Sequence, residues 1–221
     1  MKYFMRDWYD EMQVSGFLVF PDTKAEWDEN LAYYEEEGID IKQVEKENLA
    51  YIKEDLLKFL PESFHTYIYN GTINSEYPTP KLREMVDQWQ LKFEERMTSK
   101  RDAYRKSYES IKDSLPENVI KLHENSLHDA KVTVVERPSD DVLVMILDCR
   151  GGFHYFTDIR VTFLGVKELI VPERLTGSWW LYDEVYVKEK GFEYYVLLDN
   201  PLQEVKIVAD DVWIEELNPS V

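Results

Sequence analysis

The spacing of apolar side chains changes near residue 127. Before that point apolar residues recur three or four positions apart, which is the period of a helix, and after about residue 130 they alternate with polar residues, which is the period of a strand. The pattern predicts an α+β protein with a helical region over residues 1–126 and a sheet domain over residues 127–221. About six to eight strands with tight connections predict a mostly antiparallel sheet.

The helical region divides into longer and shorter helices. They are predicted, in order, over residues 5–13, 23–37, 41–57, a short segment after Pro61, 80–115 and a short segment after Pro116. Thr23 and Glu26 fit a capping box, and Gly38 fits a left-handed helix end. The helix over 80–115 would be about 50 Å long at 1.5 Å per residue. A helix of that length either bridges the two regions or supports a homodimer.

The sheet domain contains one continuous apolar run and several alternating ones. Residues 142–147 form the continuous run, which predicts a central strand that is buried on both faces. Two alternating runs flank the Gly-containing segment 188–191, which predicts a β-hairpin. The last run, over residues 204–217, predicts one or two strands that are interrupted at Asp210 and Asp211.

The first strand of that hairpin is rich in aromatic residues. Strict alternation would place Trp180, Tyr182 and Tyr186 on one face, together with Glu184, and Tyr195 on the partner strand extends the set. If helices cover only the other face, this aromatic and acidic face is a surface for binding a protein or a ligand. The alternative is that a second layer or a second subunit covers it.

Two of the four histidines, His123 and His128, lie close together in the sequence, and a carboxylate follows each of them. Their spacing of five residues turns the second side chain about 140° away from the first on a helix, so the pair does not form a helical zinc motif. The doublet His128-Asp129 resembles that of metal-dependent phosphohydrolases, but it opens a sheet instead of lying in a helical bundle. We predict that it fixes the corner between helix and strand.

The remaining chemistry of the sequence is sparse. Cys149 and His154 suggest a thiol nucleophile, but the chain is acidic and Cys149 ends an apolar strand, so a packed thiol is predicted instead. The sequence contains no Gly-rich phosphate loop and no Ser nucleophile elbow. We therefore predict no catalytic residue, no metal ligand set and no cofactor.

Charge restricts the partners of the protein. The 221 residues include 26 Lys and Arg and 44 Asp and Glu, for a net charge of −18. This field disfavours binding to nucleic acids and to anionic membrane surfaces, and it attracts a basic protein partner or a cation. The alternative is that the acidity only maintains solubility. A single Cys and the lack of an apolar segment of about 20 residues indicate a cytoplasmic protein.

Four segments resemble a family of uncharacterised bacterial proteins, mainly from spore-forming Firmicutes. They are residues 1–23, 55–65, 110–119 and 126–132, and the similarity runs along almost the whole chain. This resemblance implies no activity and no catalytic residue. Residues 127–129, before an antiparallel sheet, also look like the segment that opens several small bacterial domains, some of them immunity proteins of toxin systems.

Three hypotheses about function follow. The first is a non-catalytic, immunity-like interaction module that binds a basic partner. The second is a metal-dependent hydrolase that uses a His-Asp site, and the third is a self-associating structural module. The residues predicted to bind a partner or ligand are His128, Asp129, Trp180, Tyr182, Glu184, Tyr186 and Tyr195.

Overall fold

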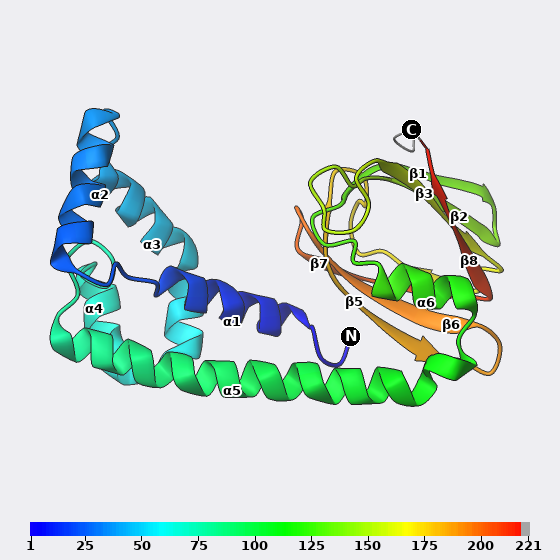
Figure 1. Cartoon of the computed structure of the whole chain (residues 1–221), viewed down its shortest axis with the longest axis horizontal. Coiled ribbons are helices and arrows are strands. Elements are labelled where there is room, and N and C mark those ends of the chain that lie inside the picture. Colours follow the sequence, from blue (N-terminus) through cyan, green and yellow to red (C-terminus); the bar gives the residue numbers. More distant parts are fainter. Residues whose placement is uncertain (218–221) are drawn as a thin grey trace. The chain divides into compact units, whose positions relative to one another are not determined.

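The structure is a computed structural model that describes residues 1–217, and it confirms the α+β fold. The chain forms two compact units (Figure 1). The helical unit comprises Trp8–Ser99, and the sheet unit comprises Met1–Asp7 together with Lys100–Val221. The chain therefore crosses between the units twice. Within residues 1–217, no helix combines the length and the apolar character that a membrane span requires.

The helical unit is built from five helices. They are α1 (Arg6–Phe17), α2 (Lys24–Glu36), α3 (Ile41–Phe59), α4 (His65–Asn70) and α5 (Pro80–Ile111), the first and last of which continue into the sheet unit. α1 runs four residues beyond its predicted end, because Val14 and the following Leu18 are buried and keep this segment packed. In the core, the Trp89 indole N–H donates to the Phe59 carbonyl at 3.2 Å, which links α5 to the end of α3.

α2 differs from the other long helices of this unit. The predicted capping box is confirmed, since the Thr23 side chain accepts from the Glu26 amide and the Glu26 side chain accepts from the Thr23 amide. However, none of the residues of α2 is buried. The helix is held by its cap and by one partly covered apolar stripe, and this stripe becomes important below.

The sheet unit contains eight antiparallel strands in the order β4-β7-β6-β5-β1-β2-β3-β8. The strands are β1 (Lys131–Ser139), β2 (Val142–Asp148), β3 (Asp158–Leu164), β4 (Glu168–Ile170), β5 (Trp179–Val187), β6 (Phe192–Asp199), β7 (Gln203–Ala209) and β8 (Asp211–Glu216). The helix α6 (Glu117–Glu124) contacts both β5 and β8, which are separated by three strands. The sheet therefore curves around α6 (Figure 1).

The core of the sheet unit lies on this concave side. Val119 and Leu122 of α6 pack against the inward side chains of the strands, and Tyr104 and Tyr108 of α5 complete the cluster. The predicted hairpin joins β5 and β6, with Lys188 and Gly191 hydrogen bonded across the turn. Gly191 has a φ of 77°, and a side chain there would collide with the backbone of Ala209. We call the sheet surface that faces away from this core the outer face.

Candidate functional site

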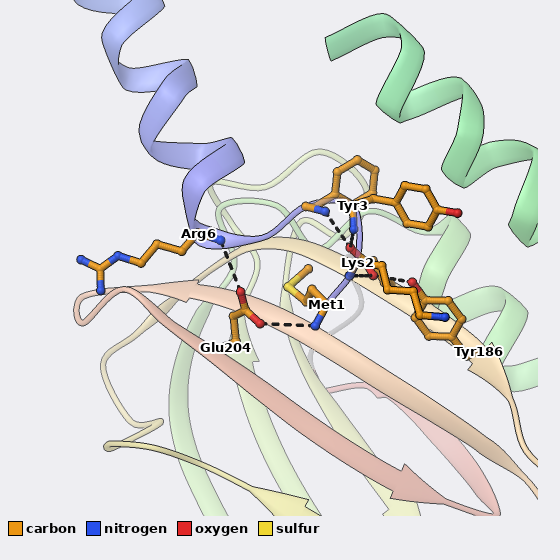
Figure 2. Close-up of polar contacts among 8 residues, drawn as sticks. Met1, Lys2, Tyr3, Arg6, Tyr186 and Glu204 are labelled. Atoms are coloured by element: carbon orange, nitrogen blue, oxygen red, sulfur yellow. Dashed lines mark hydrogen bonds and ion pairs between the residues drawn. The ribbon is translucent and has the colours of Figure 1, made fainter. Parts of the chain in front are cut away.

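The N-terminal segment Met1–Phe4, which we call the strap, lies on the outer face of the sheet (Figure 2). The backbone amides of Lys2, Tyr3 and Phe4 all donate to the carboxylate of Glu184 on β5, at 2.8, 2.7 and 2.6 Å. The same carboxylate accepts the Tyr186 hydroxyl at 2.5 Å, and Glu184 is fully buried. Successive amides that converge on one anion form a nest, here made by the strap around a side chain of the sheet.

A second carboxylate holds the first residue of the strap and the first residue of α1. Glu204 on β7 accepts from the Met1 amine and from the Arg6 amide, each at 3.3 Å (Figure 2). The Lys2 ammonium lies 4.7 Å from the centre of the Tyr186 ring, which is a cation–π contact. The outer face therefore binds both the backbone of the strap and its basic side chain, that of Lys2.

The aromatic side chains of the strap contact aromatic residues of the sheet unit. The rings of Tyr3 and Phe4 lie 5.4 and 5.0 Å from the ring of Tyr104, and Phe4 lies 5.9 Å from Tyr182. Burial raises the pKa of Tyr186, and its hydrogen bond to Glu184 raises it further. Tyr186 therefore remains a protonated donor to Glu184 at any physiological pH.

The predicted alternation along β5 is wrong at Trp180. A β-bulge between Trp180 and Tyr182 inserts Leu181 and shifts the register by one residue. As a result, Trp180 is 1% exposed and packs in the core cluster, while Tyr182, Glu184 and Tyr186 share the outer face. Tyr195, opposite Glu184 on β6, lies on the outer face with its ring 6.0 Å from that of Tyr186.

The core side of β5 carries a largely buried polar network that the sequence did not predict. Asp183 accepts from His123 Nδ1 on α6 and from the Trp180 indole N–H at 3.2 Å. His123 Nε2 lies 3.1 Å from the Tyr104 hydroxyl, which also accepts the Val185 amide at 2.9 Å. In the neutral tautomer that fits both contacts, Nδ1 donates to the Asp183 carboxylate and Nε2 accepts from the Tyr104 hydroxyl.

This order, from carboxylate through imidazole to hydroxyl, resembles a catalytic relay. The pKa of Tyr104 is raised by burial and then by the charge of Asp183, which is the opposite of the activation that a nucleophile or base needs. Every polar group of the relay also has a partner within the protein. We therefore assign a structural role to the network.

His128 and Asp129 occupy the corner between α6 and β1, apart from His123. The ring of His128 lies 5.3 Å from Tyr182 and 5.7 Å from Phe153, and its Nδ1 lies 3.1 Å from the Asp129 carboxylate. Asp129 adopts a left-handed φ of 66°, and its backbone amide donates to the Trp180 carbonyl at 2.9 Å. The Asp129 backbone thus supplies one of several backbone bonds between this corner and the start of β5, and its carboxylate lies beside the His128 ring.

The other predicted chemistry does not converge on one place. His65 lies beside Tyr69 in α4, and His154 lies beside Tyr155 in the loop after β2. Among residues 1–217, no three His, Cys, Asp or Glu side chains are grouped closely enough to hold a metal ion. The hypothesis of a metal-dependent hydrolase therefore has no geometric support.

Cys149 is a free and buried thiol, as predicted. Burial raises the pKa of Cys149 to about 12, and the charges of Asp148 and Asp158 contribute. Because the thiolate reacts and the thiol does not, we expect an aromatic disulfide reagent at pH 8 to label the native chain about a thousandfold more slowly than the unfolded chain. The comparison is made in buffer and in urea. Equal rates would contradict the raised pKa.

Sequence reasoning missed the strap and two of the residues that it contacts, namely Glu204 on β7 and Tyr104 on α5. A signal existed in residues 2–6, where two basic and two aromatic residues precede an otherwise acidic chain. Their target could not be found by spacing, because about 180 residues separate the strap from Glu184.

The fold and the site together define an α+β protein whose curved antiparallel sheet carries a buried carboxylate, Glu184, that is bound by the strap of the same chain. A family model described as "Protein of unknown function (DUF4085)" matches residues 3–209. The chain belongs to this family. No curated protein matches the sequence.

Proposed function

We propose that the protein is a non-catalytic interaction module whose outer sheet face binds a basic and aromatic segment of a partner protein. The observation that carries this proposal is Glu184. A fully buried carboxylate requires donors, and the strap supplies three backbone amides. In this proposal the strap is the resident occupant of the site, and a partner segment of similar chemistry takes its place.

The chemistry of the strap defines the segment that this face accepts. The Lys2 ammonium contacts an aromatic ring, and Tyr3 and Phe4 contact Tyr104. Contacts to backbone amides give affinity for any extended segment, and the side-chain contacts select basic and aromatic residues. The net charge of −18 adds long-range attraction for a basic partner. If the likeness of residues 127–129 to immunity proteins reflects function, the partner is a toxin.

A labelled peptide with the sequence of residues 2–6 tests the proposal by fluorescence anisotropy. The wild-type chain should bind it weakly, because the tethered strap competes at an effective concentration of about millimolar. In a chain with Tyr3→Ser and Phe4→Ser, the strap loses its aromatic contacts, and the peptide should bind at least tenfold more tightly. Adding Glu184→Gln should remove that binding.

Two controls make the result specific. Glu215→Gln changes a carboxylate that is 63% exposed in an ion pair on β8, and it should leave peptide binding unchanged. High salt should weaken the binding, because part of it is electrostatic. If the strap-weakened chain is folded and binds no peptide, the strap is only a structural element and the proposal is wrong. If this chain instead dimerises with wild-type chains by accepting their straps, the partner is a second copy.

A further inference from the structure

The helical unit contains an open pocket of about 350 Å³ between α2, α3 and the chain after α1. This volume lies at the small end of the range for small-molecule sites. The apolar part of its lining includes Phe17, Phe20, Trp27, Leu31, Tyr34 and Ile41. Trp27, Leu31 and Tyr34 form the stripe of α2, and no residue of that helix is buried. The pocket therefore exposes to solvent a stripe of the kind that usually packs into a core.

The polar part of the lining is centred on Glu45 and Asn74. Asn74 is 8% exposed, and its amide N–H₂ group donates to the Glu45 backbone carbonyl at 2.9 Å and to the Glu45 carboxylate. These two acceptors fix the orientation of the amide, because only its nitrogen can face them. The Asn74 Oδ1 is buried and has no hydrogen-bond partner among residues 1–217. A buried acceptor without a donor is costly, and a ligand can supply the donor.

The carboxylate of Glu45 also lacks a cation. None of the ion pairs formed within residues 1–217 includes it, and burial raises its pKa while the hydrogen bond from Asn74 lowers it. Lys42, one helical turn earlier on α3, also lines the pocket but is exposed. The surrounding segment 22–58 contains twelve acidic and five basic residues. Both the pocket and its surroundings thus favour a positively charged ligand.

We propose that this pocket binds an organic cation in which an apolar body carries a primary ammonium or a guanidinium group. The apolar body lies among the aromatic residues, and the cationic group donates to the Glu45 carboxylate and to Asn74 Oδ1. Aromatic walls further favour a cation through their ring faces. A free amine and the side chain of a lysine or arginine in a peptide share this chemistry.

Titration of the full-length protein, followed by NMR, tests the proposal. The ligands are phenethylamine and its neutral analogue phenethyl alcohol, and the signals are the Asn74 side-chain amide and the Trp27 indole N–H. We expect the amine to shift both signals and to bind at least tenfold more tightly than the alcohol. A short acetylated peptide with a central Lys, run beside the amine, decides whether the ligand is a free amine or a side chain.

Three variants test how amine binding depends on the charges of the pocket. Glu45→Gln should remove the preference for the amine, and Lys42→Gln should tighten amine binding several-fold, because a competing cation is gone. Glu47→Gln, on the same helix and outside the pocket lining, should change nothing. The proposal is overturned if the alcohol binds as well as the amine, if folded Glu45→Gln keeps the preference, or if neither signal shifts. The result is independent of the strap site, which lies in the sheet unit.

Discussion

Replacement of Asp183 by Ala is expected to lower the free energy of unfolding of the sheet unit by about 3–5 kcal/mol. Asp183 is 11% exposed, and its loss leaves the His123 ring and the Trp180 indole N–H without their acceptor inside the core. Removal of one partner of a buried pair costs more than the pair contributes, because the remaining polar groups stay desolvated. The bond from Tyr104 to His123 weakens as well, since the orientation of the imidazole depends on Asp183.

Urea denaturation followed at NMR amide signals of β5 and β6 measures this effect. These signals report on the sheet unit separately from the helical unit, which matters because a chain with two units need not unfold in one step. Asp102→Ala is the matched control, because its carboxylate is 58% exposed and forms an ion pair with Arg105 three residues later. It should leave the midpoint unchanged. Equal effects of the two variants would show that water, and not the network, satisfies the groups around Asp183.

Much of the fold could be predicted from local patterns. The period of apolar residues predicted the long helix and the separation of helices from strands, and the capping box at Thr23 was confirmed in both of its bonds. These features depend on residues within one or two helical turns of each other. A sequence displays such neighbours directly.

The candidate sites depend on neighbours that the sequence does not display. The bulge at Leu181 follows from the pairing of β5 with β6, and it moved Trp180 to the core. The stripe of α2 illustrates a different difficulty. Trp27 and Leu31 have the same spacing whether protein covers them or whether they line an open pocket. Periodicity therefore predicts which side of a helix is apolar, but not what covers it.

Adjacent carboxylates on β5 show how the two faces of one strand differ in role. Asp183 points into the core and binds side chains of α6 and β5, and Glu184 points outward and binds the strap. We expect the core network to open only when the sheet unit unfolds, because its groups lie against the core. The strap forms no strand of the sheet, and we therefore expect it to detach while the sheet stays intact. Substitution of Asp183 should therefore affect the unfolding of the whole sheet unit, whereas substitution of Glu184 should affect the hydrogen exchange of the strap amides.

Glu184→Gln is expected to speed hydrogen exchange at the amides of Tyr3 and Phe4 by about a hundredfold, which corresponds to about 2–3 kcal/mol. Glutamine keeps one acceptor oxygen but loses the charge that strengthens the bonds from the strap. The Val185 amide, which donates to Tyr104 in the core, should exchange at its wild-type rate. Native-state exchange by NMR measures all three amides in one sample.

The prediction depends on the difference between exchange at the strap amides of Tyr3 and Phe4 and exchange at the core amide of Val185. If the strap opens locally, Glu184→Gln can remove no more stability than the free energy with which the strap is docked. The unfolding midpoint of the sheet unit should therefore move far less than in Asp183→Ala. Glu215→Gln, at an exposed carboxylate on β8, should change none of the three rates. If exchange at Val185 rises as much as at Tyr3, the strap is part of the cooperative core and cannot exchange with a partner segment. If only the strap amides respond, the outer face can be vacated while the fold is kept, which is what a replaceable occupant requires.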